Sequence, residues 1–294
     1  MSRARAWAEV LRVSGLLTVP GDVVAGAAAA GGRPEPRVLR AIGCSLCLYE
    51  AGMALNDWAD QEEDARERPH RPLPSGRLAP APVLGAAIGL TAAGIALAAT
   101  AGRHAALVAG TLAATVWAYD LKLKHTKAGP AAMGAARGLD LLLGAVAAGR
   151  RRPGRTAWLS AAALAAHTAA VTHVSRSETT GGDSRAPLAA LAATAGIGLA
   201  VRGRTDAGGP GHPASRVVPA ALAAAYAATA ARPLAHAVLN PSPPLVQRAV
   251  GGGLRALIPL QGALTARAGS PALGAALLVG APIVRRLARR VGLT

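Results

Sequence analysis

Apolar and polar residues occur in long separate blocks along this chain of 294 residues. Stretches such as 83–101, 105–118 and 156–171 consist mainly of Ala, Leu and Val and carry at most one ionisable residue. Short segments rich in Arg, Lys, Pro and Gly separate them. About 20 consecutive apolar residues can cross the hydrocarbon layer of a membrane as a helix, because a helix satisfies its backbone hydrogen bonds internally. The pattern predicts an all-α, multi-pass membrane protein.

The apolar runs and the breakers between them define nine spans and one ambiguous segment. The predicted spans cover residues 13–30, 38–60, 82–101, 104–120, 130–149, 156–174, 186–201, 215–236 and 271–288. Segment 245–267 is either a tenth span or a helix lying in the membrane interface. The first span is broken at Pro20, Gly21 and Asp22 and lacks a cleavage site, so we interpret it as retained. No connecting segment is long enough for a soluble domain, and residues 1–294 are expected to form one transmembrane domain.

The composition fits this interpretation. Hydrophobic residues make up 52% of the chain and there are 35 glycines, and small residues let membrane helices approach closely. A water-soluble helical bundle would carry polar residues at every third or fourth position of its helices. These runs do not.

The chain is strongly basic, with 32 Lys and Arg against 15 Asp and Glu. Nucleic-acid binding is the usual first explanation for such a balance. Here the cations lie between apolar runs and few aromatic residues accompany them, so contact with lipid headgroups is the better explanation. We therefore expect membrane lipid rather than nucleic acid as a partner. The Arg and Ala bias favours a bacterial inner membrane.

Two cysteines, Cys44 and Cys47, form a C-x-x-C pattern inside an apolar run. A metal or redox site would need a second pair or a different structural setting. Plain buried thiols are expected.

The chemistry-bearing residues concentrate between positions 56 and 77, where the sequence reads NDWADQEEDARERPHRPLPSGR. In a continuing helix, Asp57, Asp60 and Asp64 fall at i, i+3 and i+7 and share one face. Carboxylates stacked in this way repel one another, and a divalent cation removes the repulsion. Mg²⁺ prefers one or two carboxylates together with phosphate oxygens, and Asn56 adds a neutral oxygen. We predict Asp57, Asp60 and Asp64 as metal ligands and catalytic groups.

The arginines that follow, Arg66, Arg68, Arg71 and Arg77, suit the outer oxygens of a diphosphate. The alternative is an ordinary salt-bridge cluster between a solvated helix end and a basic loop. Three acids in register beside an asparagine, in a membrane setting, favour the metal site.

These residues carry a family resemblance. The N-D-x-x-D-x-x-x-D run from Asn56, followed by R-P-L-P-S-G at 71–76, resembles the first aspartate-rich motif and loop of UbiA-type prenyltransferases. Segment 119–134 (YDLKLKHTKAGPAAMG) resembles that family's stretch between its fourth and fifth helices. The S-R-x-E string at 175–178 resembles the EboC-like branch, which is associated with a prenylated, cyclitol-like lipid.

The resemblance implies nine transmembrane helices around a central cavity, with two acidic motifs facing each other near the cytoplasmic side. It implies an enzyme that uses Mg²⁺ to ionise a prenyl diphosphate and passes the prenyl group to a small aromatic or hydroxylated acceptor. We assign the remaining substrate-binding positions on this basis: Asn56, Arg71, Lys124, Arg137, Arg176 and Glu178 toward the diphosphate, and Asp22 toward an acceptor hydroxyl.

The second acidic motif departs from the family pattern. Segment 172–183 (THVSRSETTGGD) holds only Glu178 and Asp183 as acids, five residues apart, which is a poor match to one helical face. Either the second metal is absent, or Arg176 contacts the diphosphate directly. The weak motif leaves open a non-catalytic binder or carrier of prenyl diphosphate.

Ionisable residues inside the apolar runs are costly and usually face a cavity or a partner. Arg137 and Asp140 lie at i and i+3, where they can pair with each other. Together with Asp22 they also allow an ion relay in a secondary transporter. His167 is expected to pack or cap rather than to bind metal.

Overall fold

The computed structural model describes all residues except 1–2, 13–17, 33–34, 150–151, 203–213 and 291–294, and gives no side-chain surroundings for 214–215 and 281–290. Every regular element within the described residues is helical, which confirms the all-α prediction. The elements are α1 (Arg3–Val10), α2 (Val19–Ala29), α3 (Pro36–Ala59), α4 (Gln61–Glu67), α5 (Pro80–Ala101), α6 (Arg103–Ala118), the π-helix η2 (Tyr119–Leu123), α7 (Gly129–Ala147), α8 (Arg155–Ser175), α9 (Arg185–Val201), α10 (Ala214–Leu239), α11 (Pro243–Arg267) and α12 (Pro271–Arg290).

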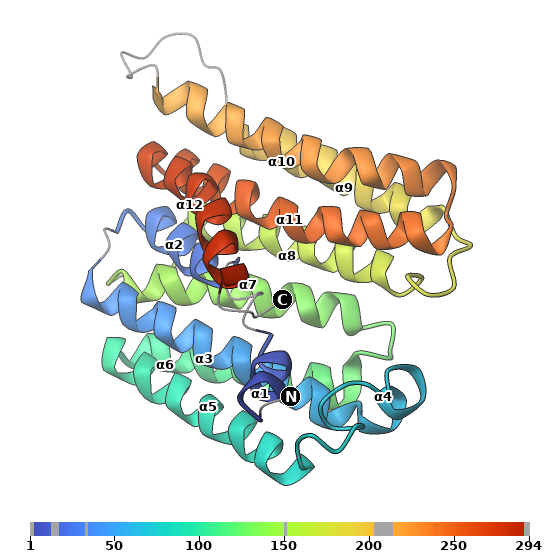
Figure 1. Ribbon diagram of the computed structural model, residues 1–294. Coiled ribbons are helices and arrows are strands. Elements are labelled where there is room, and N and C mark those ends of the chain that lie inside the picture. Colours follow the sequence, from blue (N-terminus) through green and yellow to red (C-terminus); the bar gives the residue numbers. More distant parts are fainter. Residues whose placement is uncertain (1–2, 13–17, 33–34, 150–151, 203–213, 291–294) are drawn as a thin grey trace.

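The long helices pack side by side, with α5 and α6 along one edge and α9 and α10 along the opposite edge (Figure 1). Between these edges α2 and α7 belong to both large apolar clusters. Ala25 and Leu141 lie in the cluster shared with α8 to α11, whereas Val23 and Leu143 lie in the cluster shared with α3, α5 and α6. The pair α2 and α7 therefore joins the two halves of the bundle.

Three helices of the described part of the chain are long and apolar enough to cross a membrane: α3, α5 and the Arg216–Leu239 part of α10. Most other predicted spans correspond to helices of nearly the same bounds, but the number of membrane crossings stays a prediction. Part of the first span, 13–17, lies outside the described residues.

Segment 245–267 lies within α11, and its surroundings decide between the two predictions for it. Residues 256–266 are buried without exception. A helix lying in the interface would leave one face exposed. The interfacial alternative is wrong, and α11 is a core helix that contacts α2, α8, α10 and α12.

Close contact between α2 and α7 depends on two glycines. A Cβ atom at Gly26 would collide with the backbone carbonyl of Leu141, and one at Gly144 would collide with the carbonyl of Val23. Each helix therefore lies directly against the backbone of the other.

We expect Gly144→Ala to lower the free energy of unfolding by about 1–3 kcal/mol, the usual cost of overpacking a dense core. Thermal unfolding of the purified protein in detergent measures this. Gly89→Ala on α5 is the matched control, because nothing lies within 4 Å of the added Cβ. An equal response of the two variants would show that close α2–α7 contact is not needed.

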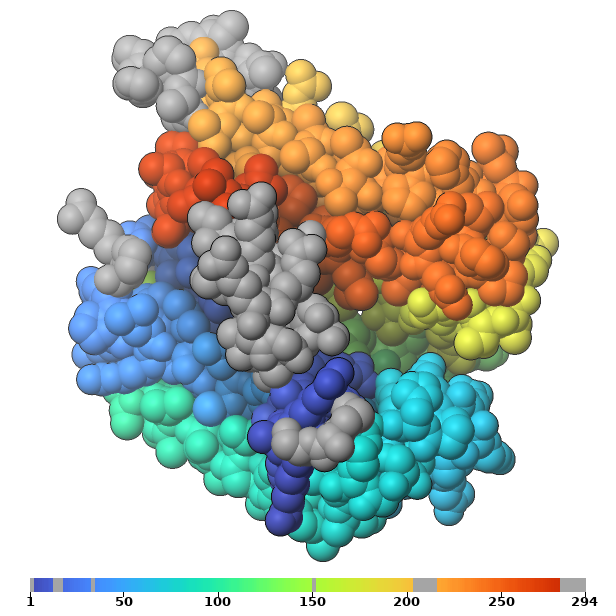
Figure 2. Space-filling view, viewed as in Figure 1, coloured from blue at the N-terminus to red at the C-terminus, as the bar shows by residue number. Residues whose placement is uncertain are grey.

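Helix α1 lies across one end of α3, beside the segment that contains α4 (Figure 2). Its buried side chains, Ala6 and Val10, pack in an apolar cluster with Leu55 and residues of the 73–78 loop. The Arg77 Nη2 atom lies 2.8 Å from Glu9 Oε2, and hydrogen bonding to Arg77 lowers the pKa of Glu9. The chain leaving α1 therefore starts next to the acidic motif.

Candidate active site

The acidic motif spans the junction of α3 and α4. Helix α3 ends at Ala59, and the Asp60 backbone has φ −94° and ψ 11°. Hydrogen bonds from Asp60 N to Asn56 O (3.0 Å) and from Asp64 N to Asp60 O (2.8 Å) carry the helical register across the junction. The structure therefore places Asp57 and Asp64 on one face, as the sequence spacing predicts.

Asp57 and Asp64 are buried, at 4% and 2% exposure, and share one arginine. The Arg71 Nη1 atom lies 2.7 Å from Asp64 Oδ2 and 3.4 Å from Asp57 Oδ1. Arg68 Nη1 lies 3.5 Å from Asp64 Oδ1. Burying two carboxylates without water is costly, and these guanidinium groups offset much of that cost. The RPLPSGR loop folds back to bring Arg71 to both acids.

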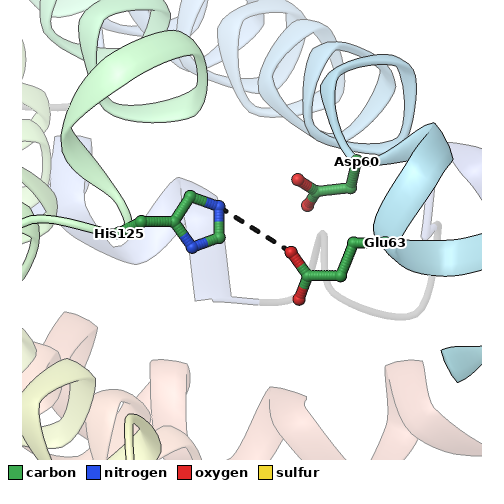
Figure 3. A group of neighbouring side chains, drawn as sticks. All are labelled: Asp60, Glu63 and His125. Carbon is green, nitrogen blue, oxygen red and sulfur yellow. Dashed lines mark ion pairs between the residues drawn. The ribbon is translucent and has the colours of Figure 1, made fainter. Parts of the chain in front are cut away.

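Asp60 has different neighbours from the other two acids. It forms an ion pair with the Lys124 ammonium, which follows η2. The three aspartates therefore divide between two sets of partners, since Asp57 and Asp64 share Arg71 whereas Asp60 pairs with Lys124. Figure 3 shows Asp60 beside Glu63 and His125, whose Oε2 and Nε2 atoms are 3.8 Å apart. One ligand atom from each of these three residues lies within 4.8 Å of the other two.

Two residues of the site were missed by the sequence analysis. Asp120, on η2, is 5% exposed, and its Oδ1 accepts a hydrogen bond of 3.2 Å from Asn56 Nδ2. The sequence did contain a signal for Asp120, because this residue is an acid at the end of an apolar run.

The second missed residue is Arg12, just after α1. Its Nη2 atom lies 3.1 Å from Asp57 Oδ1 and 3.5 Å from Asn56 Oδ1. Its backbone has φ 46°, a left-handed conformation that is uncommon for residues other than glycine. Arg12 is 44 residues before Asn56 in the chain, so no local pattern links it to the motif.

A cavity of about 280 Å³ begins at this charged group and runs between α3, α6 and α7. Arg12, Asn56 and Asp120 line one end, which we call the mouth. Ser45, Arg137 and Asp140 line the other end, which we call the floor. The walls between them are mostly apolar and are formed by Val19, Leu48, Tyr49, Gly52, Met53, Leu112, Val116, Tyr119, Met133 and Ala136.

Arg137, one of the predicted diphosphate-binding residues, pairs with an acid of the neighbouring helix α2. Arg137 Nη1 lies 2.6 Å from Asp22 Oδ2, and Asp22 is completely buried. The predicted pairing of Arg137 with Asp140 is replaced by this ion pair, because the close α2–α7 packing brings Asp22 to Arg137. Asp140 instead accepts a hydrogen bond of 2.7 Å from Ser45 Oγ.

The 176–183 loop contributes fewer acidic residues to the candidate site than the family pattern implies. Arg176 Nη1 donates a hydrogen bond to the Thr126 carbonyl in the loop that carries Lys124. Burial raises the pKa of Glu178, and the charge of nearby Arg68 opposes the shift. Asp183 accepts a hydrogen bond of 2.8 Å from the Arg185 backbone at the start of α9. Arg176 and Glu178 therefore lie near the acidic motif, whereas Asp183 is used locally.

One histidine and two cysteines were predicted to pack in the helices rather than to take part in chemistry, and the structure places them at packing positions. The His167 ring contacts Tyr226 Oη and the Gly253 carbonyl, each at 3.0 Å, in the core. Cys44 is a buried free thiol, and Cys47 is a partly buried one.

Comparison with known proteins agrees with this fold. Residues 19–239 match the UbiA prenyltransferase family. Among curated relatives, digeranylgeranylglyceryl phosphate synthase of Methanopyrus kandleri is 33% identical over 127 residues, covering 42% of this chain and 45% of that protein. The enzyme of that name from Thermococcus gammatolerans is 34% identical over 153 residues, covering 50% and 54%. The chain thus matches about half the length of these relatives.

Solved structures share the fold over most of this chain at low sequence identity. A UbiA homologue from Aeropyrum pernix gives a TM-score of 0.67 at 20% identity, covering 85% of this chain and 96% of that one. A UbiA homologue from Archaeoglobus fulgidus, solved with DMAPP and Mg²⁺, gives 0.59 at 14% identity, covering 85% and 98%.

The fold is thus that of an intramembrane helical bundle with a charged cavity mouth. The chain belongs to the UbiA prenyltransferase family, which confirms the resemblance seen in the sequence. The EboC-like assignment stays a prediction.

We expect Arg71→Gln to leave Asp57 and Asp64 buried without their shared cation. The free energy of unfolding should fall by about 2 kcal/mol, less than for a fully buried pair because the Arg71 side chain is 22% exposed. Thermal unfolding in detergent without Mg²⁺ measures the loss. Arg66→Gln is the control, since Arg66 is exposed and donates a hydrogen bond to the Glu62 carbonyl. Similar midpoints for the two variants would contradict the shared role of Arg71.

Proposed function

We propose that this protein is an intramembrane prenyltransferase that transfers a prenyl group from a prenyl diphosphate to a small hydroxyl-bearing acceptor. The observation that carries the proposal is the gathering of carboxylates and cations at one end of an apolar cavity. A prenyl diphosphate has the matching form, with a highly charged head and an apolar tail. The head would bind at the mouth and the tail would extend along the walls.

Mg²⁺ fits the donor atoms at the mouth. Asp57, Asp60, Asp64 and Asp120 supply carboxylate oxygens, and Asn56 supplies an amide oxygen, the hard ligands that Mg²⁺ prefers. Bound there with the diphosphate, Mg²⁺ supplies neutralisation of the charge that develops on the leaving group.

The cations of the mouth have a complementary role. Arg71 and Arg12 both contact Asp57, and Lys124 contacts Asp60. Groups held among these carboxylates are suited to bind the outer oxygens of the diphosphate and to stabilise its charge as the bond to C1 breaks.

The walls protect the reactive carbon. Leu48, Met53 and Val116 exclude water from the cavity. Tyr49 and Tyr119 also line it and offer ring faces that stabilise a nearby positive charge. The allylic cation would therefore persist until the acceptor attacks.

The curated relatives narrow the class of molecule that we expect to accept the prenyl group. The resemblance predicts an aromatic or a cyclitol-like acceptor. The curated relatives are named for a glyceryl phosphate product. We therefore favour attack by a hydroxyl oxygen. Composition favours a bacterial inner membrane, whereas these relatives are archaeal.

One observation favours the alternative of a non-catalytic binder. Asp183 is used at the start of α9, so segment 172–183 offers Glu178 as its one acid near the site. A binder would return its prenyl diphosphate intact after long incubation with Mg²⁺ and membrane lipid, and an enzyme would convert it to diphosphate and a prenylated lipid.

We expect membranes containing the protein to release diphosphate from a prenyl diphosphate in the presence of Mg²⁺. Asp60→Ala should reduce this release at least 100-fold, because it removes an acid of the proposed metal site. Asp183→Ala is the matched control and should keep most of the activity. Release that persists in excess EDTA would refute the metal role.

Arg176 is expected to compensate for the weak second motif. If it contacts the diphosphate in place of a second metal, Arg176→Ala should reduce diphosphate release at least tenfold more than Lys127→Ala. Both side chains are exposed and lie on neighbouring loops, so general loss of positive charge affects the variants equally. Equal losses would rule out a direct role for Arg176.

A further inference from the structure

The cavity has a second polar region besides the mouth. Ser45, Arg137 and Asp140 form the floor, and Ser45 and Asp140 are only 2% and 5% exposed. The contacts proposed above for the diphosphate all lie at the mouth, so that chemistry leaves the floor unused. Buried polar side chains that line a cavity in small numbers are the groups that usually fix the orientation of a ligand.

Arg137 is held so that part of its guanidinium group stays available to the cavity. Its Nη1 atom lies 2.6 Å from Asp22 Oδ2, and its Nη2 atom donates a hydrogen bond of 3.1 Å to Thr18 Oγ1. Gln261 Nε2 donates to Asp22 Oδ1 at 2.6 Å and so fixes that acid. A guanidinium group has five N–H donors, and these two contacts leave others to bind an oxygen atom in the cavity.

Ser45 and Asp140 add hydrogen-bond acceptors at the same place. Ser45 Oγ donates to Asp140 Oδ2 at 2.7 Å, and a hydroxyl oxygen that donates one bond can still accept another. The Asp140 and Asp22 carboxyls are within hydrogen-bonding reach of each other, but Asp140 Oδ1 meets no donor in the part of the chain that the structure describes. A buried acceptor without a donor is costly, so a ligand group that donates to Asp140 would be stabilised.

The charges at the floor favour a neutral ligand group over an anion. Among the described residues, two carboxyls, Asp22 and Asp140, lie beside the Arg137 guanidinium. A phosphate or carboxylate group would meet both acids, and like charges repel strongly where little water is present. A hydroxyl group carries no charge and both donates and accepts. Hydroxyl groups therefore match the donors and acceptors of the floor.

The distance from the floor to the mouth suits a small molecule. Ser45, Gly52 and Asn56 all line the cavity and follow one another along α3. A Cβ atom at Gly52 would lie 4.0 Å from Asp120 Oδ2, so Gly52 is level with a carboxylate of the mouth. Ser45 lies about two helical turns earlier, which is about 10 Å along the axis. A hydroxylated six-membered ring, about 6 Å across, would fit between these levels.

We propose that Ser45, Arg137 and Asp140 bind uncharged hydroxyl groups of the acceptor, and that the buried end of the acceptor is therefore a polyol. The inference rests on the proposed function, because it takes the diphosphate to be bound at the mouth and the prenyl chain to lie along the apolar walls. One hydroxyl group donates to Asp140 and a neighbouring one accepts from Arg137. A hydroxyl on the opposite side of the molecule then faces the mouth. Any charged group of the acceptor lies outside the floor.

The test is binding of uncharged probes to the purified full-length protein in detergent, measured by calorimetry. Mg²⁺ and saturating geranyl thiolodiphosphate, a donor that reacts very slowly, first fill the mouth. myo-Inositol should then bind at least tenfold more tightly than cyclohexanol, which has the same ring with one hydroxyl group. Equal affinities, or no binding of myo-inositol, would overturn the proposal. Inorganic phosphate should not displace myo-inositol, and displacement would show that the floor binds anions, which also overturns it.

The same experiment separates this inference from the proposed function. If geranyl thiolodiphosphate does not bind in the presence of Mg²⁺, the proposed function fails and the inference fails with it. If the donor binds but myo-inositol has no advantage over cyclohexanol, only the inference fails.

Three variants test the residues. Asp140→Ala should weaken the binding of myo-inositol at least tenfold, whereas Asp140→Asn keeps an acceptor oxygen and should stay within threefold of the unchanged protein. Thr265→Ala is the control and should change the affinity less than twofold, because Thr265 is a fully buried polar residue on α11 that does not line the cavity. If Asp140→Asn loses as much affinity as Asp140→Ala, the contact requires a negative charge rather than an acceptor for a hydroxyl group, and the proposal is overturned.

Donor affinity distinguishes ligand binding from a merely structural role of Asp140. Asp140→Ala should weaken the binding of myo-inositol at least fivefold more than that of geranyl thiolodiphosphate. Equal losses would mean that Asp140 supports the cavity as a whole, which overturns the proposal. If Asp140→Ala does not fold, Ser45→Ala decides, because it removes one hydroxyl group from the floor. It should weaken the binding of myo-inositol at least threefold, and an unchanged affinity would overturn the proposal.

Discussion

The pairing of buried carboxylates with guanidinium groups is the constraint on which the rest of this structure depends. Asp57 and Asp64 are almost completely buried, and Arg71 lies between them. In a bundle that excludes water, neither acid is tolerable alone. The loop after α4 must therefore fold back onto α3, and the same loop provides the apolar cluster on which α1 docks. Formation of the mouth and folding of the N-terminal segment are thus one event.

Two different contacts hold the ends of the cavity. The mouth depends on ion pairs between α3, the 71–78 loop and the segment after η2. The floor depends on the close crossing of α2 and α7, which only glycines at positions 26 and 144 permit. Because α3 runs from one end to the other, its length fixes their separation. The two ends of the cavity are therefore held by separate parts of the fold.

Much of the fold follows from the sequence because membrane helices are defined by local composition. The apolar runs predict helices with bounds close to those observed. The spacing of Asp57 and Asp64 and the arginine at position 71 predict that part of the charged group. Asp120, Arg12 and the Asp22–Arg137 pair could not be predicted, because each contact joins segments far apart in the chain and depends on how the helices pack. The Asp60–Lys124 ion pair likewise joins distant segments, so the spacing of the three aspartates does not reveal it.

The balance of charge at the mouth explains how one acidic motif can suffice. Among the described residues, Asp57, Asp60, Asp64 and Asp120 lie among Arg12, Arg68, Arg71 and Lys124, and Glu63 and Glu178 lie near the same group. The carboxylates therefore outnumber these cations. On the proposed function, a diphosphate head needs an added cation here, and the carboxylates are the groups able to hold it. Arg176, which donates a hydrogen bond to the Thr126 carbonyl near this group, adds one further positive charge. A second metal, held by a second set of acids, is then less necessary than in a site with two complete motifs.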